Sequence, residues 1–366
     1  MSSPSSAIGA FISHAKSWIL AYALPLLLIS YTLQNYSRSF ENRSSLNQYF
    51  RGVYASRVLG RESVVGLAIV AQFLLSHLGI AHISGVMIGW LLTNGTSFMM
   101  AALLMHRQVA RLGAKPTLLY GVLLVAMAIS ARVVTPYDLM SYTFILVVFQ
   151  YAIRGARWRC AVLMVLAVAT RESTLLVIPM IAISQVAWPS RDSSGRFAML
   201  RETIRIFRSS VTLWLLALVG MATYGTLKLI SFSSGEHPRF VQHVGASGHL
   251  GANNICGVLS ALLMVAAVRW AAGFVSSSAY VSEMRNLLWL LATPYLVICF
   301  IWGIWSEAPR LVMPLLIGEF LLTVACFPNH NCDSSNVTKM WDTVRAKSSA
   351  PLEGFESVTS LAEWID

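Results

Sequence analysis

The chain has 366 residues, of which 56% are hydrophobic and only 12% are charged, and its net charge is +11. Soluble domains carry roughly 25% charged residues, so an ordinary water-soluble fold is excluded. The basic residues lie in short runs between long apolar stretches, which is typical of membrane proteins with positive loops inside. We therefore predict a multi-pass protein that contacts membrane lipids and has no nucleic-acid partner.

A transmembrane helix needs about 20 mostly apolar residues, and the chain offers a series of such stretches. They predict an all-α, membrane-embedded fold with about nine to eleven transmembrane or re-entrant helices. We expect a short N-terminal segment at 1–16, a helical membrane domain at 17–326 and a polar C-terminal tail at 327–366. In chain order the apolar stretches are 17–34, 63–80, 86–106, 117–134, 137–153, 160–187, 211–231, 253–273, 285–305 and 311–326.

The second apolar stretch, residues 63–80, is expected to be re-entrant. Residues 35–62 contain five arginines, yet an inside N-terminus would place this segment outside. Either the N-terminus lies outside, or residues 63–80 enter the membrane and return without crossing it. The second arrangement is favoured because basic residues precede the first span and polar residues interrupt 63–80.

The stretch 160–187 is too long for one span and carries Arg171 and Glu172 at its middle, so it predicts a hairpin of two short helices. Basic clusters follow the third, fifth and sixth stretches. They share one membrane face only if the hairpin enters and leaves on that face. Residues 107–116, 154–159 and 188–210 are therefore expected in the cytoplasm.

Arg171 and Glu172 are the first candidates for a functional site, because ionisable residues at membrane depth are costly unless paired or solvated. The functional interpretation is a polar cavity in which the guanidinium grips phosphate. The alternative is a helix start that Thr170 or Ser173 caps, with Arg171 and Glu172 neutralising each other.

Further charged candidates lie at the predicted ends of spans. Glu307 and Arg310 flank a turn and could meet a lipid phosphate, or could form a solvated salt bridge. Asp138 starts a span, where it could be an N-cap or an acid of the site. Glu319 lies inside the last span and needs a partner or a proton.

The predicted outside loop at 232–252 contains His237 and His243 among several glycines, a composition suited to a mobile loop over a site. The histidine spacing matches no zinc pattern, so no metal site is predicted. The sequence does not identify a cofactor, although paired acids could recruit a divalent ion. We expect Arg57, Arg171, Glu172, Glu307 and Arg310 to converge on one extracytoplasmic cavity, since uncompensated charges at that depth are costly.

Three sequence segments carry a resemblance: "QYFRGVYASRVL", then "PYDLMSYTFILVVFQYAIRGARWRCAVLMVLAVATREST", then "SEAPRLVMPLL". Their order resembles a broad group of bacterial multispanning proteins that are similar in layout to polyprenyl-phosphate-dependent GT-C glycosyltransferases. The resemblance covers about residues 45–326 in layout. It implies an inner-membrane enzyme that transfers a sugar from a polyprenyl-phosphate donor at the extracytoplasmic face.

The resemblance also implies site roles. It places an acid in the first outside loop as general base, where residues 35–60 contain Glu41 and no aspartate. Glu172 or Asp138 takes that role if Glu41 does not. The phosphate-binding candidates are Arg57, Arg171 and Arg310, while Glu307, His237 and His243 complete the candidate site.

Two other function classes fit the same charges. A transporter or flippase would bind a lipid-linked or anionic solute through Arg171 and Arg310, with Glu172 or Glu307 carrying protons. No inverted repeat is visible to support it. An O-antigen-type polysaccharide polymerase would also use outside arginines, but it would be expected to have a larger outside loop than 232–252.

Overall fold

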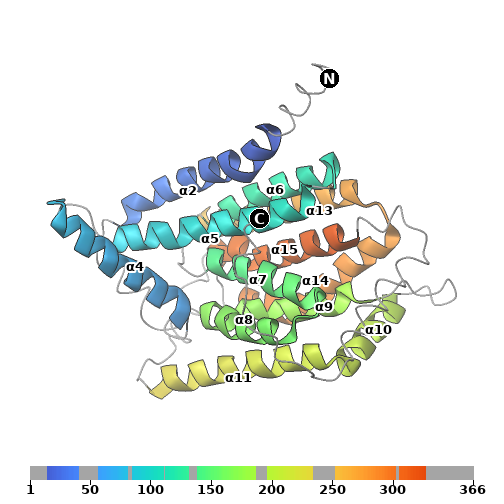
Figure 1. Ribbon diagram of the computed structural model, residues 1–366. Helices are drawn as coiled ribbons and strands as arrows, with labels where there is room; N and C mark the ends of the chain where they lie inside the picture. Colours follow the sequence, from blue (N-terminus) through green and yellow to red (C-terminus); the bar gives the residue numbers. More distant parts are fainter. Residues whose placement is uncertain are drawn as a thin grey trace, which may run out of the picture. The chain divides into compact units, whose positions relative to one another are not determined.

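The described part of the chain is entirely helical (Figure 1). The computed structural model describes residues 15–40, 57–80, 85–110, 112–131, 138–186, 196–233, 252–301 and 305–326. All of them belong to one compact unit, Met1–Pro328. Six described helices are long and apolar enough to cross a membrane, and three shorter apolar helices accompany them. These helices make the chain a multi-pass membrane protein of all-α class.

The helices follow the predicted apolar stretches closely, because each is a run of good helix formers and apolar residues bounded by polar or glycine-containing turns. The elements are η1 (Ile19–Ala23), α2 (Leu24–Phe40), α4 (Val58–His77), α5 (Gly85–Val109), α6 (Ala114–Ser130), α7 (Asp138–Ile153), α8 (Arg157–Thr170), η3 (Glu172–Leu176), α9 (Val177–Ser184), α10 (Arg196–Ser209), α11 (Val211–Ser233), α13 (Ala252–Val275), α14 (Ala279–Ile301), η5 (Trp305–Glu307) and α15 (Ala308–Cys326).

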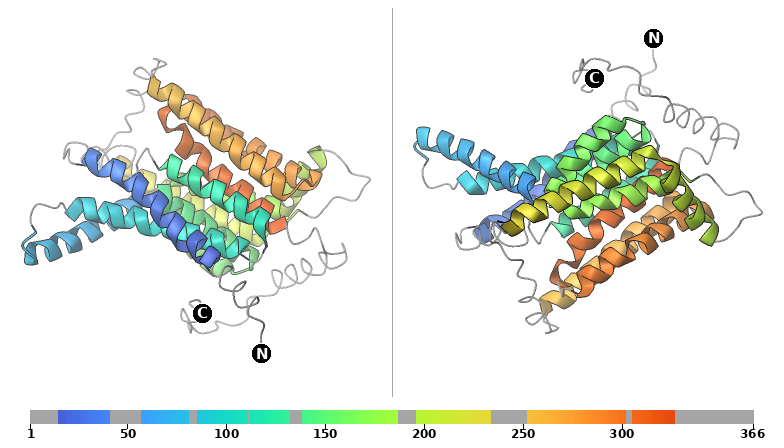
Figure 2. Two further views of the ribbon diagram at one scale, coloured as in Figure 1. Left: turned by 90° about the horizontal axis from the view of Figure 1, so that it is seen from above. Right: turned by 90° about the horizontal axis from the view of Figure 1, so that it is seen from below.

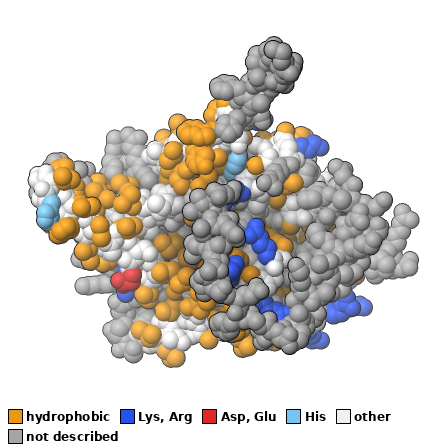
Figure 3. Space-filling model, viewed as in Figure 1, with side chains coloured by type: hydrophobic (Ala, Val, Ile, Leu, Met, Phe, Trp, Pro, Cys, Tyr) orange, Lys and Arg blue, Asp and Glu red, His pale blue; other side chains and the backbone are white. Residues whose placement is uncertain are grey.

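The last helix, α15, forms the centre of the bundle. It packs against α6, α7, α9, α13 and α14, and its side chains from Met313 to Val324 are buried. A helix that is apolar all round belongs in the interior of a large bundle. The outer helices instead expose large apolar side chains, such as Leu229 on α11 and Leu263 on α13. Figure 3 shows the same apolar character over much of one face, as expected for a lipid-facing surface.

The predicted hairpin in 160–187 is present, and it turns at Arg171. Cys160 lies beside Val148, whereas Arg171 reaches Asp138 at the start of α7, so α8 runs antiparallel to α7. The chain then runs back through α9 to the start of α14, where the Val186 carbonyl accepts a hydrogen bond from the Tyr280 hydroxyl. The backbone at Arg171 is extended, and this breaks the helix at the charged pair.

The hairpin brings the predicted basic segments to one end of the bundle. This basic end comprises the turns at 110–113, 154–156 and 276–278, together with α10, which lies across it (Figure 1, Figure 2). Lys115 over the ring of Phe274 ties the first and third turns together. In Figure 3 the visible Lys and Arg side chains gather mostly in the right half, toward this end. One shared end is what the positive-inside pattern requires.

Helix α4 does not run the length of the bundle. It packs antiparallel on the first turns of α5, where a Cβ at Gly89 would lie 2.5 Å from the Val64 carbonyl oxygen. A Cβ at Gly85 would lie 2.6 Å from the Ala68 carbonyl oxygen, so the last turns of α4 extend beyond the start of α5. Both views show α4 leaving the bundle (Figure 1, Figure 2). Because α4 is also one of the six helices long and apolar enough to cross a membrane, the re-entrant arrangement of 63–80 stays a prediction.

Candidate functional site

Six charged side chains meet at the end of the bundle opposite the basic end. We call them the six-charge cluster. They come from segments far apart in the sequence: the start of α4, the start of α7, the break between α8 and η3, and the turn from η5 into α15. Five of the six were predicted to converge from the sequence, and Asp138 joins them. The cluster consists of Arg57, Asp138, Arg171, Glu172, Glu307 and Arg310.

Arg57 and Glu172 form a two-point ion pair. The Nη2 and Nε atoms of Arg57 donate to the two carboxylate oxygens of Glu172 at 2.6 and 3.2 Å. A planar guanidinium fits a carboxylate in this side-by-side geometry. The Arg57 side chain is 7% exposed and that of Glu172 is 37% exposed. The Glu172 carboxylate is therefore partly accessible, whereas its partner Arg57 is buried.

Arg171 and Asp138 form the buried centre of the cluster. The Nη1 of Arg171 donates to Asp138 Oδ1, and both side chains are almost completely buried. Asp138 Oδ2 lies 3.8 Å from Arg310 Nη1, so one carboxylate faces two arginines. Breaking such a buried pair leaves an uncompensated charge, which costs about 3–5 kcal/mol. Asp138 thus holds Arg171 and Arg310 in place.

Arg310 closes the other edge of the cluster. Its Nη2 donates to Glu307, three residues earlier in the chain, and its carbonyl oxygen accepts a hydrogen bond from the Tyr142 hydroxyl at 3.3 Å. The Glu307 side chain is partly exposed, whereas that of Arg310 is buried. The pair is therefore more than the solvated turn salt bridge that the sequence also allowed, because its arginine belongs to the buried network.

The helix-cap interpretation of the 170–173 region is wrong. No side chain caps η3; the Thr170 hydroxyl donates to the Leu166 carbonyl instead. Arg171 and Glu172 also do not neutralise each other, since each pairs with a residue from another helix. An extended residue between two helices points neighbouring side chains in different directions, which lets one charge serve α7 and the other α4.

The cluster is neutral as a set, with three arginines and three carboxylates. Two of its polar atoms, Arg171 Nε and Asp138 Oδ2, are nevertheless buried without a hydrogen-bond partner among the described residues, and so is the hydroxyl of Ser173, next to Glu172 in the chain. Buried polar atoms are normally bonded, so these atoms lack a partner that a polar ligand group could supply.

The cluster is recessed from the ends of the outer helices. Tyr224 of α11 lies within electrostatic range of Glu172 and Arg57. From Tyr224, α11 continues to Ser233, about 14 Å further at 1.5 Å per residue. The central helices α7 and α15 begin at the level of the cluster instead. The cluster therefore lies within the bundle and not at the tip of α11.

The remaining predicted site residues Glu41, His237 and His243 lie outside the described residues, as does the polar tail at 327–366. Among the residues that the structure does describe, no group of three or more His, Cys, Asp or Glu side chains is placed to hold a metal ion. Cys160, Cys256 and Cys326 are free thiols. The cluster itself offers carboxylates and guanidinium groups.

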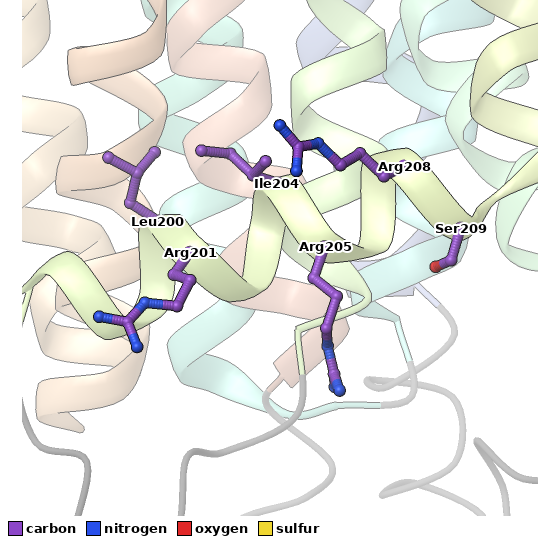
Figure 4. A pocket seen from close by; sticks show the side chains of 6 residues that line it. All are labelled: Leu200, Arg201, Ile204, Arg205, Arg208 and Ser209. Carbon is purple, nitrogen blue, oxygen red and sulfur yellow. The ribbon is translucent and has the colours of Figure 1, made fainter.

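A surface hollow of about 700 Å³ lies at the basic end, away from the cluster. It is formed by one face of α10, whose other face packs on the bundle through Met199 and Ile206. Figure 4 shows its side chains projecting from this single helix. The hollow combines arginines with apolar contacts, which is typical of a helix lying at a lipid surface. Its lining residues are Leu200, Arg201, Ile204, Arg205, Arg208 and Ser209.

No family model, no curated protein and no solved structure matches this chain. The resemblance to polyprenyl-phosphate-dependent glycosyltransferases therefore remains an expectation from the sequence, and the site must be interpreted from its own geometry.

Proposed function

We propose that the six-charge cluster binds the phosphate of a polyprenyl-phosphate-linked sugar and that the protein transfers the sugar to an acceptor hydroxyl. The observation that carries this proposal is the Arg57–Glu172 pair, in which a partly exposed carboxylate is held against a buried guanidinium at the edge of a largely buried ionic network. A phosphate can replace the carboxylate at Arg57 with the same two-point geometry, which frees Glu172 to act as a base.

The transfer step balances with these groups alone. Glu172 accepts the proton of the acceptor hydroxyl, whose oxygen forms a bond to the anomeric carbon of the donor sugar. The bond from that carbon to the phosphate oxygen breaks, and its electron pair stays on the lipid phosphate. Arg57 and the buried Arg171 stabilise the negative charge that grows on this leaving group.

Asp138 has a different role in this proposal. A general base must come within hydrogen-bond reach of the acceptor, and Asp138 is 3% exposed and engaged with Arg171 and Arg310. We assign it the positioning of these two arginines. Glu41 keeps the base role that the resemblance gives it as an alternative to Glu172.

The basic end supports an extracytoplasmic position for the cluster. Lys and Arg accumulate in cytoplasmic loops, and the described basic turns and α10 lie at the end opposite the cluster. We therefore propose an inner-membrane protein that acts at the outer face, where a polyprenyl-phosphate donor presents its sugar.

A transporter or flippase of a lipid-linked or anionic solute is the second candidate. The observation that favours it is the helix break at Arg171, because broken helices with charges at the break are characteristic of binding sites in transporters. Substrate binding at the six-charge cluster is common to both functions, whereas sugar transfer is specific to the first.

Transfer of radiolabelled sugar from a polyprenyl-phosphate donor tests the proposal. Glu172→Gln should lower the transfer rate by about 10²–10⁴-fold, because it removes the base, while the donor still binds. The melting temperature should fall, because the buried Arg57 loses its charged partner, but the protein should still fold, because the amide oxygen can accept from Arg57. Glu62→Gln is the matched control, since Glu62 pairs with Arg61 on the exposed surface. Full transfer by Glu172→Gln would remove the base role, and donor binding by wild type without any transfer would favour transport.

A further inference from the structure

A second group of buried charges lies toward the basic end, where α13, α14 and α15 meet. We call it the Glu319 cluster: Glu319, Arg269, Arg285 and Trp289. Glu319 is fully buried within α15, and its Oε1 accepts hydrogen bonds from Arg269 Nε at 2.9 Å and from Trp289 Nε1 at 2.6 Å. Glu319, for which the sequence predicted a partner or a proton, is therefore paired with Arg269.

Arg285 gives this cluster an excess of positive charge. It is 7% exposed, and its Nε and Nη1 atoms are buried without a hydrogen-bond partner among the described residues. It lies within electrostatic range of Glu319 and Arg269. Glu319 is already paired with Arg269, so two arginines share one carboxylate and the cluster carries a formal charge of +1. A buried charge without compensation is costly, which indicates a missing anion.

The Glu319 cluster is accessible from the side of the bundle. Arg269 is 40% exposed through its side chain and donates from Nη2 to the exposed Asn286 at 2.6 Å. Its neighbour Trp270 is 65% exposed. Arg269 is about 9 Å from the end of α13 at Val275, at 1.5 Å per residue, and this depth matches the head-group region. Tryptophan and arginine gather at that level in membrane proteins.

We propose that the Glu319 cluster binds a phosphate group at the basic end, separate from the six-charge cluster. Arg285 and Arg269 supply charge-assisted donors, Asn286 adds a neutral donor, and Trp270 supplies an apolar edge. The phosphate comes from an anionic lipid head group or from free phosphate. Arg285 decides the affinity for phosphate, because its positive charge is not compensated by a described carboxylate.

Removing the charge of Arg285 and removing the charge of Glu319 should change phosphate binding in opposite directions. Arg285→Met removes the excess charge at nearly unchanged volume, so it should stabilise the ligand-free protein and abolish the ligand's effect. Glu319→Gln raises the formal charge and keeps an oxygen that can accept from Trp289, so it should strengthen phosphate binding. Arg205→Gln is the matched control, because Arg205 is a highly exposed arginine on α10 at the same end.

The experiment measures thermal unfolding of the delipidated, detergent-solubilised full chain with phosphatidylglycerol in one arm and inorganic phosphate in the other. At a hundredfold excess over the dissociation constant, the active ligand should raise the melting temperature by about 5 °C in wild type and Arg205→Gln, and by none in Arg285→Met. An effect of phosphatidylglycerol alone assigns the site to a lipid; an effect of inorganic phosphate assigns it to the free anion.

Equal stabilisation of wild type and Arg285→Met, or no stabilisation of wild type by either ligand, would overturn the proposal. Failure of Arg285→Met to fold would do so as well, since it would mean that Arg285 is already compensated within the protein. Phosphorus analysis of the gently purified proteins gives a second measurement. Wild type should retain at least one phosphate group per chain more than Arg285→Met, which lacks the charge that decides affinity.

Discussion

At the residue scale, one carboxylate determines the geometry of the candidate site. Asp138 is the shared partner of Arg171 and Arg310, which come from the α8 break and from α15. An arginine at this depth without a counter-charge is unstable, so the position of each depends on that carboxylate. The sequence indicates Asp138 as an isolated acid, but its two partners are distant in the chain, and sequence position alone does not reveal them.

Asp138→Asn should therefore destabilise the protein strongly. It removes the charge that both arginines share, and the expected loss is about 3–5 kcal/mol in the free energy of unfolding. Thermal unfolding in detergent measures this, with Ser141→Ala as the control because the Ser141 hydroxyl only donates to the carbonyl of its own helix. A loss below about 1 kcal/mol would mean that the arginines have other compensation.

The pairing of Arg269 with Glu319 was not predicted, and neither was the position of Arg285 within electrostatic range of both. The signal was present, because both arginines interrupt long apolar helices, as Arg171 does. Charge inside an apolar run shows that a partner is required. It does not show which helix provides the partner, because that depends on how α13 and α14 pack on α15.

At the element scale, the position of Arg57 depends on close contact between α4 and α5. The backbones approach at Gly85 and Gly89, where a side chain would meet the α4 backbone. Glycine permits this approach as small residues do at other membrane helix interfaces. Arg57 is at the N-terminal end of α4, so the packing of these two helices directs it toward Glu172.

Gly89→Ala should push α4 away from α5. The added Cβ would lie 2.5 Å from the Val64 carbonyl oxygen, and overpacking of this kind costs about 1–3 kcal/mol. Donor binding at the six-charge cluster should fall with stability, because Arg57 moves with α4. Gly121→Ala on α6 is the matched control, since nothing lies within 4 Å of its added Cβ. Identical donor affinities for the two variants would contradict the dependence on α4.

Most helices were predictable because each is encoded by its own apolar run, and α5, α7, α11 and α15 begin and end within a few residues of the predicted stretches. The hairpin was predictable too, since a charged break and the basic flanks both required it. The helix cap that the sequence allowed at Thr170 is absent. Local sequence favours a cap wherever a hydroxyl precedes an apolar run, but the backbone here is extended at Arg171.

At the scale of the whole molecule, charge is divided between two ends. The basic end carries Lys115, Arg154 and the arginines of α10, while the other end carries the neutral six-charge cluster. The two buried clusters lie toward opposite ends as well, and the Glu319 cluster is the one with excess positive charge. In the proposed function, the basic end orients the protein in the membrane and the other end binds the anionic substrate.

The central claim is that the six-charge cluster is a phosphate site and not only a structural network. Exchanging the charges of its half-open pair, in the double variant Arg57→Glu with Glu172→Arg, separates the two roles. The exchange of the exposed neighbours, Arg61→Glu with Glu62→Arg, is the control.

Binding of polyprenyl phosphate is measured by native mass spectrometry alongside the melting temperature. We predict that the double variant recovers the melting temperature lost in each single variant but binds polyprenyl phosphate at least tenfold more weakly than wild type, because the guanidinium has left the base of the site. Recovery of both stability and full binding would show that the pair only ties α4 to η3, and would contradict the account.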